Sequence, residues 1–204
     1  MNKKTIALDA DGVLLDYGAA YPRAWQRAFG VFPAEADPYA YWPIDRWGVE
    51  RLTGDRLAQF RRQFDEEFWS SMAAMDGALD AAHALHDAGY ELICVSALEP
   101  AFARARLRNL RGLGFPIETV IATSAAVDER NPKAAAVSEL APVAFVDDFL
   151  PYLAGLPASV HTALLRSQAT GSPNHGPGLQ AVKSQHSNLA EFSRWWLDPH
   201  RVMP

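Results

Sequence analysis

The stretch Thr5-Ile6-Ala7-Leu8-Asp9-Ala10-Asp11-Gly12 indicates the fold class of this chain. Its apolar first half predicts a short buried strand that ends at two carboxylates. Because a strand repeats its facing every second residue, Asp9 and Asp11 begin on the same side of the chain. Gly12 allows a sharp turn directly after them. Carboxylates in that position lie where open α/β sheets bind their ligands, so the stretch predicts an α/β fold with a site at this strand end.

Two neighbouring carboxylates at a strand end suit nucleophilic and acid–base chemistry. One of them can attack an electrophilic centre and form a covalent intermediate. The other can protonate a leaving group and then deprotonate water. Their repulsion favours a shared proton or a bound cation, and a hard cation such as Mg²⁺ takes carboxylate and carbonyl oxygens. A turn without catalytic function can have the same residues, because Asp-Gly is common turn chemistry.

Three later stretches carry polar side chains at comparable positions. Residues 91–96 are an apolar run that ends in a hydroxyl, and residues 143–148 are an apolar run that ends in two adjacent carboxylates. Between them, Asn131-Pro132-Lys133 is expected to open an alanine-rich helix, with the asparagine as N-cap and the lysine in the first turn. A cation at that end opposes the helix dipole, which is a hint of a functional residue.

In order and spacing, the four stretches resemble the four motifs of the haloacid dehalogenase-like (HAD) superfamily. The first matches its Asp-x-Asp-Gly nucleophile motif, the second its strand-end Ser or Thr, the third its lysine and the fourth its acidic metal motif. The superfamily pattern often has a further acid several positions on, where this chain has Pro151 and Tyr152. The resemblance implies a catalytic pair (Asp9, Asp11), a phosphate-binding set (Asp11, Gly12, Ser96, Lys133) and a metal-binding set (Asp9, Asp11, Asp147, Asp148), in which Asp148 is the main acidic-motif ligand and Asp147 an auxiliary acid.

The resemblance also implies an architecture and a reaction. The implied fold is a Rossmann-like parallel sheet with helices on both faces, formed by residues 1–16 and 76–204. A small α-helical cap, residues 17–75, is inserted after the first strand. The implied reaction is Mg²⁺-dependent hydrolysis of a phosphomonoester through an aspartyl-phosphate on Asp9. The acid at Asp11 separates the phosphatases of this superfamily from its dehalogenases, which lack it.

Other functions are compatible with the same motifs. A phosphosugar phosphatase or a phosphoglucomutase-like phosphotransferase uses the same paired acids, and the mutase returns the phosphate to its substrate. A phosphate-binding module without turnover belongs to another class of protein. The intact acids and Lys133 argue against such a module.

Aromatic residues crowd the expected cap, and Trp42, Trp47 and Arg46 are predicted to contact the substrate. The two tryptophans fall in a proline-rich, irregular stretch rather than at helical spacing. Rings above a phosphate site can stack on a flat base, and arginine can supply hydrogen bonds or stacking. The aromatic cap and the terminal Trp195-Trp196 loosely resemble those of the 5'(3')-deoxyribonucleotidases. Nucleoside monophosphates are therefore the expected substrates.

The composition narrows the class of partners. With 204 residues, of which 49% are hydrophobic, the chain suits one domain or one domain with an insertion. A formal net charge of -5 argues against a nucleic-acid polymer as partner. The single cysteine, Cys94, lies in an apolar run, and no apolar run reaches membrane-spanning length. We expect a cytoplasmic protein that acts on a small-molecule phosphomonoester without a membrane partner; the sequence does not indicate its oligomeric state.

Apolar periodicity predicts the remaining elements. A basic helix at residues 99–113 is expected to turn its arginines to solvent. Residues 166–187, which are rich in Gly, Pro, Ser and His, are expected to form a long structureless loop. The other expected elements are helices around residues 21–29 and at 53–69, 78–88 and 188–197, and strands at 117–122 and 160–165.

Overall fold

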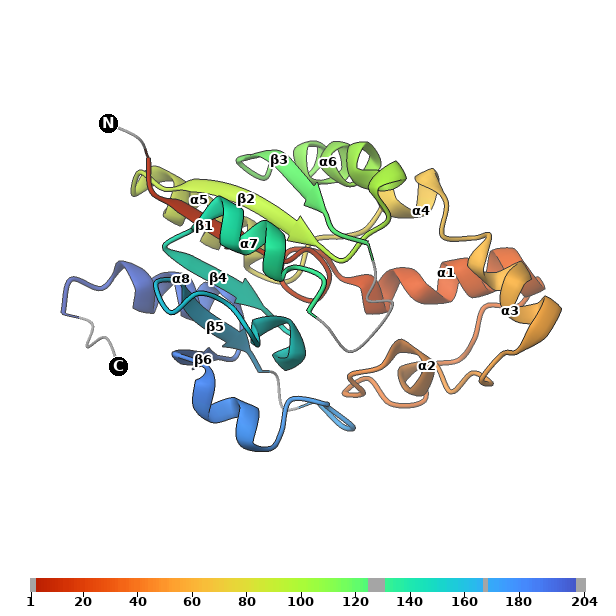
Figure 1. Cartoon of the computed structure of the whole chain (residues 1–204). Helices are drawn as coiled ribbons and strands as arrows, with labels where there is room; N and C mark the ends of the chain where they lie inside the picture. Colours follow the sequence, from red (N-terminus) through yellow and green to blue (C-terminus); the bar gives the residue numbers. More distant parts are fainter. Residues whose placement is uncertain (1–2, 125–130, 167–168, 201–204) are drawn as a thin grey trace.

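Six parallel strands form one sheet in the order β3-β2-β1-β4-β5-β6 (Figure 1). This computed structural model describes residues 3–124, 131–166 and 169–200. Each apolar run that the sequence marks as a strand is found in the sheet, and Asp9 and Ser96 stand at the carboxyl ends of β1 and β2. The strands are β1 (Thr5–Leu8), β2 (Glu91–Ser96), β3 (Ile117–Ala122), β4 (Ala144–Asp147), β5 (His161–Leu165) and β6 (Ser184–His186).

Helices cover both faces of this sheet, because alternate strand residues point to opposite sides. Ile6, Leu8 and Cys94 join one apolar cluster, which also contains the inner faces of α5 (Ala78–Asp87), α6 (Ala103–Gly112) and α8 (Leu189–Leu197). Ala7, Ile93 and Val95 join a second cluster with α7 (Ala134–Leu140) and the 3₁₀ helix η2 (Leu150–Leu153). The predicted Rossmann-like α/β fold is confirmed, and Cys94 is buried as a small hydrophobic residue.

The strand order places a crevice beside β1. The chain runs from β1 to β2 on one side and returns to β4 on the other, so β1 and β4 are neighbours. Leu8 pairs with Val146, and the Asp9 N–H continues the ladder with a 2.9 Å bond to the Val146 carbonyl. Open α/β sheets bind ligands at such a reversal of strand order, outside the carboxyl ends of the strands.

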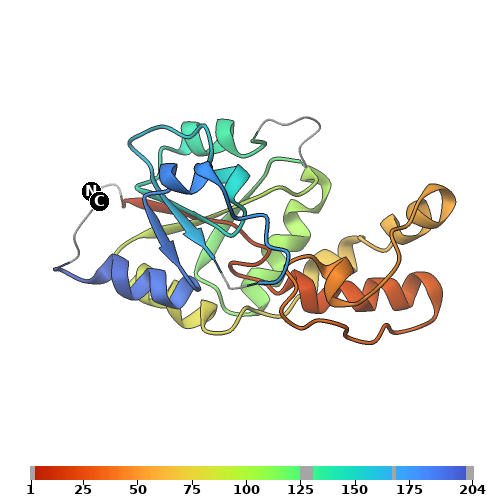
Figure 2. The ribbon, with the colours of Figure 1, turned by 90° about the horizontal axis from the view of Figure 1, so that it is seen from below.

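A helical segment, residues 17–75, lies beyond those carboxyl ends (Figures 1 and 2). The chain leaves and re-enters the sheet region along two adjacent stretches, because the Asp16 N–H bonds the Ala73 carbonyl and the Met75 N–H bonds the Leu14 carbonyl, each at 2.9 Å. Asp16 also caps the first helix through a 2.8 Å bond from the Ala19 N–H. The segment holds α1 (Tyr17–Phe29), α2 (Pro43–Arg46), α3 (Gly54–Arg61) and α4 (Glu66–Ser70).

The single helix predicted for residues 53–69 is wrong, because the chain forms two helices, α3 and α4, with a turn between them. The Asp65 carboxylate accepts a 2.9 Å bond from the Phe68 N–H and so caps a new helix start. The rings still meet as the apolar spacing predicts: Phe64 lies 5.0 Å from Phe60 and 4.7 Å from Phe68, both edge to face. These rings build the interior of the segment.

The structureless loop predicted for residues 166–187 is also wrong in part. It contains the 3₁₀ helix η3 (Pro177–Ala181) and the edge strand β6, while residues 167–168 lie outside the described part. The strand was missed because its three residues, Ser-Gln-His, show no apolar alternation. It is held by parallel pairing with β5 and by hydrogen bonds that link the Ser184 hydroxyl to the Nε2 atoms of His161 (2.8 Å) and His186 (2.9 Å).

Of two other predicted helices, one begins differently in the structure and one begins as expected. The basic helix begins as a 3₁₀ turn, η1 (Pro100–Phe102), before α6. The last helix starts as expected, because the Asn188 side chain accepts a 2.9 Å bond from the Glu191 N–H. In the residues that the structure describes, no helix combines the length and apolar character needed to cross a bilayer.

Candidate active site

The loop after β1 is a tight turn that presses against the loop after β4. Its closing bonds join the Leu15 N–H to the Ala10 carbonyl (2.8 Å) and the Gly12 N–H to the Leu15 carbonyl (2.9 Å). Gly12 has φ +82°, a left-handed conformation that favours glycine. A Cβ atom there would also overlap the Asp148 carboxylate. Glycine is therefore needed both for the turn and for the close approach of Asp148.

A buried lysine joins the two strand ends. The Nζ atom of Lys133 lies 2.6 Å from Asp9 Oδ1 and 2.7 Å from Asp147 Oδ2, and the whole side chain is inaccessible to solvent. The ring of Tyr152 covers the ammonium group, at 4.8 Å from its centroid. These two carboxylates raise the pKa of Lys133 above its usual value, against the effect of burial. The two ion pairs therefore favour the charged form of this lysine.

Lys133 does not stand in the first turn of a helix, as the sequence predicts, but directly before α7 at its N-cap position. Asn131 is not the N-cap either. Its Oδ1 accepts a 2.9 Å bond from the Lys133 N–H, and its Nδ2 donates to the Tyr152 carbonyl at 2.6 Å. The asparagine thus ties the lysine to the chain after β4, and this local turn delays the helix start.

Three carboxylates converge beside the lysine. Asp9, Asp147 and Asp148 each offer an oxygen, and these oxygens lie within 4.8 Å of one another. Burial raises the pKa of Asp147, and it raises the pKa of Asp148 well above its usual range, where the charges of Asp147 and Asp9 add to the effect. One lysine cannot neutralise three carboxylates. The oxygen donors and the excess negative charge fit a hard divalent cation.

Asp11 stands apart from that cluster. Its carboxylate lies 2.8 Å from a terminal nitrogen of Arg106, and the side chain is still 31% exposed. Burial raises the pKa of Asp11, while Arg106 acts in the opposite direction. Of the predicted metal-binding set, the structure brings together the carboxylates of Asp9, Asp147 and Asp148, and the Asp11 carboxylate is not part of that group.

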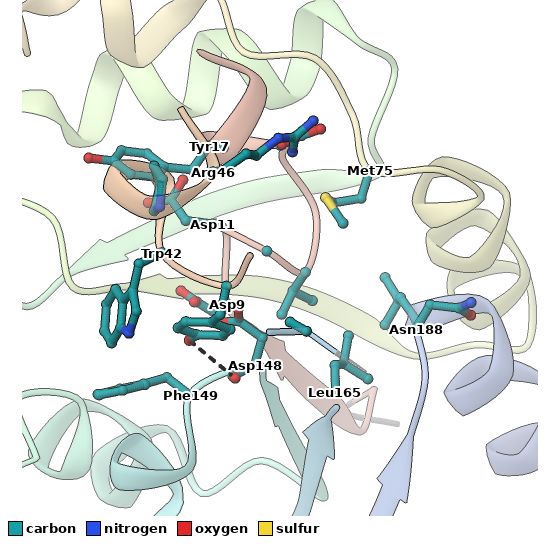
Figure 3. Close-up of a pocket in the computed structure, with 18 of the residues that line it drawn as sticks. Asp9, Asp11, Tyr17, Trp42, Arg46, Met75, Asp148, Phe149, Leu165 and Asn188 are labelled. Carbon is teal, nitrogen blue, oxygen red and sulfur yellow. Dashed lines mark hydrogen bonds between the residues drawn. The ribbon is translucent and has the colours of Figure 1, made fainter. Parts of the chain in front are cut away.

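A pocket of about 870 Å³ opens above these groups. Ser96, at the carboxyl end of β2, is buried but reaches its wall. Figure 3 shows Trp42 and Phe149 on one side of Asp9 and Asp148, with Met75, Leu165 and Asn188 on the other. All members of the predicted phosphate-binding set line this one pocket: Asp11, Gly12, Ser96 and Lys133.

One wall of the pocket is aromatic. Trp42 packs edge to face on Phe149 at 6.2 Å and on Tyr41 at 4.9 Å, and it remains 42% exposed. The Tyr41 hydroxyl lies 3.4 Å from the Asp148 carbonyl. The Tyr41 N–H also bonds the Thr170 carbonyl at 2.9 Å, and the Thr170 N–H bonds the Tyr39 carbonyl at 2.8 Å. The helical segment is therefore joined to the sheet region at this wall.

Of the three residues predicted to contact the substrate, two line the pocket and one does not. Trp42 and Arg46 line the pocket, and the Arg46 Nε donates to Glu35 at 2.7 Å. Trp47 does not line it. Its indole N–H donates to the Gly18 carbonyl at 2.8 Å and its ring packs on Phe32. Trp47 thus stabilises the fold of the segment. The spacing of aromatic residues in the sequence does not distinguish such a structural role from contact with a substrate.

Arg106 is a site residue that the sequence reasoning missed. The arginines of the basic helix were expected to face solvent, but Arg106 is completely buried against Asp11, while Arg104, Arg108 and Arg111 are exposed. A signal was present: Arg106 stands three and four residues before Asn109 and Leu110, which are buried on the same face of α6.

Asn174 is a second missed residue, and it lies in the stretch predicted to be structureless. Its Nδ2 donates to the Asp148 carbonyl at 2.6 Å, and its Oδ1 accepts from the Leu150 N–H at 2.8 Å. The side chain is 2% exposed. It braces the chain that carries Asp148, close to the positions where the superfamily pattern often has a further acid. The polar composition of the stretch did not single it out.

Comparisons with known proteins show the fold. No protein-family model and no curated protein sequence matches the chain. A HAD family hydrolase from Deinococcus radiodurans, solved with bound phosphate and sodium, is 17% identical over 93% of this chain and 93% of its own, with a TM-score of 0.60. A predicted phosphoglycolate phosphatase from Haemophilus somnus is 16% identical over 94% and 97%, with a TM-score of 0.61. An L-2-haloacid dehalogenase is 17% identical over 96% and 100%, with a TM-score of 0.59.

The chain therefore has the fold of the HAD-like hydrolases, as the four motifs predicted. Structures with this fold include both a predicted phosphoglycolate phosphatase and an L-2-haloacid dehalogenase, so the fold does not select the reaction. The side chains at the pocket have to do so.

Replacing Asn174 by Ala tests the bracing of the Asp148 loop. The Leu150 N–H and the Asp148 carbonyl would lose their buried partner, which costs about 1–3 kcal/mol. We expect the free energy of unfolding, measured by urea denaturation, to fall by that amount. His175→Ala, at the exposed neighbouring position, should change it by less than about 0.5 kcal/mol. Equal values for the two variants would contradict the bracing role.

Proposed function

We propose that the chain is a Mg²⁺-dependent phosphomonoester hydrolase that works through an aspartyl-phosphate intermediate. The observation that carries this proposal is the Lys133 ammonium group held between Asp9 and Asp147, on the floor of a pocket that Asp11 and Ser96 also line. The HAD-like fold, which the chain shares with a hydrolase solved with phosphate and with a predicted phosphatase, supports it.

Each side chain then has a role in two displacement steps. An Asp9 oxygen attacks phosphorus and forms the aspartyl-phosphate, while the bond from phosphorus to the leaving oxygen breaks. Asp11 donates a proton to that oxygen and afterwards takes one from a water molecule. The water attacks the phosphorus, releases inorganic phosphate and restores Asp9. The Ser96 hydroxyl and the Lys133 ammonium group hold the phosphoryl oxygens throughout.

Mg²⁺ is the proposed cofactor, and Asp9, Asp148 and the backbone carbonyl of Asp11 would hold it. When bound, it would offset the negative charge of the phosphoryl group. Carboxylate and carbonyl oxygens are the ligands that this hard cation takes. Asp147 is the auxiliary acid, because its carboxylate is engaged by Lys133 at 2.7 Å and by the Phe149 N–H at 2.9 Å.

Residues 17–75 are proposed to act as a cap that selects the substrate. The core handles only the phosphoryl group, so selectivity must come from what surrounds the leaving group. Trp42 presents a half-exposed ring to the pocket beside Phe149 and Tyr41. Stacking of a base on such a ring contributes about 1–3 kcal/mol. Nucleoside monophosphates are therefore the proposed substrate class, with Arg46 as a further contact.

A phosphosugar phosphatase or a phosphoglucomutase-like phosphotransferase is the second candidate, since either would use Asp9 and Asp11 in the same way. The aromatic wall ranks it below the nucleotide hydrolase. A phosphate-binding module without turnover has no observation in its favour. The proposed setting is the cytoplasm, which accords with the single, buried Cys94.

Asp9→Asn tests the nucleophile. An amide cannot form the covalent intermediate, so we expect phosphate release in the presence of Mg²⁺ to fall by on the order of 10⁴-fold or more. The variant should stay folded, because Lys133 keeps Asp147 as a partner. Asp87→Asn, an exposed change on α5, is the control and should match the wild type. Near-wild-type turnover in Asp9→Asn would refute the assignment.

The metal assignment predicts different effects for the two adjacent acids. Asp148→Asn should raise the Mg²⁺ concentration needed for half-maximal rate more than Asp147→Asn, because Asp147 is already occupied by Lys133. Rates are measured during a Mg²⁺ titration, and the thermal stabilisation by Mg²⁺ alone is measured in parallel. The reverse order would exclude this division of roles, and activity that persists in EDTA would exclude the metal.

The substrate class is tested through Trp42. Wild-type kcat/KM should be higher for a nucleoside monophosphate than for a hexose or triose phosphate. Trp42→Ala should reduce the nucleotide value about 5- to 150-fold, which corresponds to about 1–3 kcal/mol, and spare glycerol phosphate. Phe32→Ala removes an exposed ring of the same segment away from the pocket and serves as control. A preference for sugar phosphates, or one that Trp42→Ala leaves intact, would end the nucleotide proposal.

A further inference from the structure

Arg106 enters the site from the protein interior rather than from the pocket. It lies on α6, its side chain is inaccessible to solvent, and it is not among the residues that line the pocket. One terminal nitrogen lies 2.8 Å from Asp11 Oδ1 and donates to Asp11 Oδ2 at 3.0 Å. The Asp11 carboxylate therefore has the guanidinium group on its inner side and the pocket on its outer side.

The other contacts of the guanidinium group are weak. Its second terminal nitrogen meets the Met72 sulfur at 3.3 Å, and its Nε has no hydrogen-bond partner among the described residues. The ring of Trp69 faces it at 5.0 Å. Within the described chain, Asp11 is the one carboxylate that pairs with this cation.

Burial of the Arg106 guanidinium group in this environment is expected to destabilise the folded state. A buried guanidinium group with an unsatisfied N–H loses solvation that one ion pair repays only in part. An apolar residue at position 106 could fill the space between Met72 and Trp69 without that loss. Costs of this kind are expected at functional positions.

We propose that Arg106 is a positioning residue, which holds the Asp11 carboxylate in the orientation from which it exchanges a proton with the leaving group and with water. The inference rests on the proposed function. A general acid must lie within hydrogen-bond reach of the oxygen that it protonates. A displacement of about 1 Å costs on the order of 10²-fold in rate. Arg106 itself touches no substrate, because Asp11 stands between it and the pocket.

The Arg106 guanidinium group, which pairs with Asp11, also contacts the ring of Trp69. Trp69 belongs to α4 of the helical segment, lines the pocket and donates its indole N–H to the Phe64 carbonyl at 3.0 Å. Arg106 thus lies between the helical segment and the loop that carries Asp11. A fixed position of α4 is then part of what keeps Asp11 aligned.

The test uses Arg106→Met and Arg106→Lys in the full chain with Mg²⁺. Both substitutions keep a long side chain between Met72 and Trp69, and only lysine keeps a cation for Asp11. Rates are compared on an alkyl phosphate, whose leaving oxygen needs a proton, and on nitrophenyl phosphate, whose leaving oxygen does not. Arg108→Met, at an exposed position of the same helix, is the matched control, and thermal melting verifies folding.

We expect Arg106→Met to lower kcat on the alkyl phosphate about 10- to 100-fold with little change in KM, and to lower it much less on nitrophenyl phosphate. Arg106→Lys should recover part of the loss. In an Asp11→Asn background, Arg106→Met should add no more than about a twofold loss, because both changes remove the same proton transfer. Arg108→Met should match the wild type.

Equal losses on the two esters, or full additivity with Asp11→Asn, would overturn the positioning role while the hydrolase itself stands. A wild-type protein that releases phosphate from neither ester would instead overturn the proposed function, and the inference with it. If Arg106→Met does not fold, the rates of Arg106→Lys and the wild type are compared on the two esters instead. A larger loss on the alkyl phosphate would then support the positioning role, and equal losses would overturn it.

Discussion

The juxtaposed ends of β1 and β4 depend on a buried cation, the ammonium group of Lys133, which lies between Asp9 and Asp147. Carboxylates removed from water are costly unless a positive charge is close. The lysine therefore allows the ends of β1 and β4 to carry acids side by side, and it links α7, which begins directly after it, to both strand ends. The three carboxyl groups beside it, of Asp9, Asp147 and Asp148, offer the oxygens that a divalent cation would meet.

The position of this cation is a consequence of topology. Adjacent placement of β1 and β4 brings Asp9 next to the acidic pair, although almost 140 residues separate them in the chain. Gly12 then lets the first loop approach Asp148 without a steric clash. Two asparagines hold the surrounding chain: Asn131 ties Lys133 to the backbone after β4, and Asn174 ties that same region to the stretch before β6. These neutral hydrogen bonds orient charged groups without adding charge to a site that already holds an excess.

The aromatic residues of the helical segment divide into two groups by environment. Phe60, Phe64 and Phe68 pack on one another and give a segment of four short helices an interior of its own. Trp42 remains half-exposed at the pocket, and the backbone pairing of Tyr39 and Tyr41 with Thr170 holds that wall against the sheet region. Aromatic residues thus stabilise the fold of the segment in one place and line the pocket in another. The two roles are distinguished by how far each ring is buried.

The sequence by itself determined what local rules control. The strand runs, the carboxylates at their ends, the turn at Gly12 and the cap at Asn188 follow from spacing and from hydrogen bonds between residues a few positions apart. The order and spacing of four motifs were enough for the HAD-like fold and for part of the pocket lining, namely Asp9, Asp11, Gly12, Ser96, Lys133 and Asp148. Tertiary structure decided which way side chains on amphipathic elements face. It turned Arg106 inward, gave Asn174 a role, and separated Trp47 from Trp42, because burial depends on neighbours that are distant in the chain. It also added β6, since pairing with β5 outweighed the local pattern. The division of residues 53–69 into two helices, in contrast, is local, because the Asp65 carboxylate caps α4 through the N–H of Phe68 three residues on.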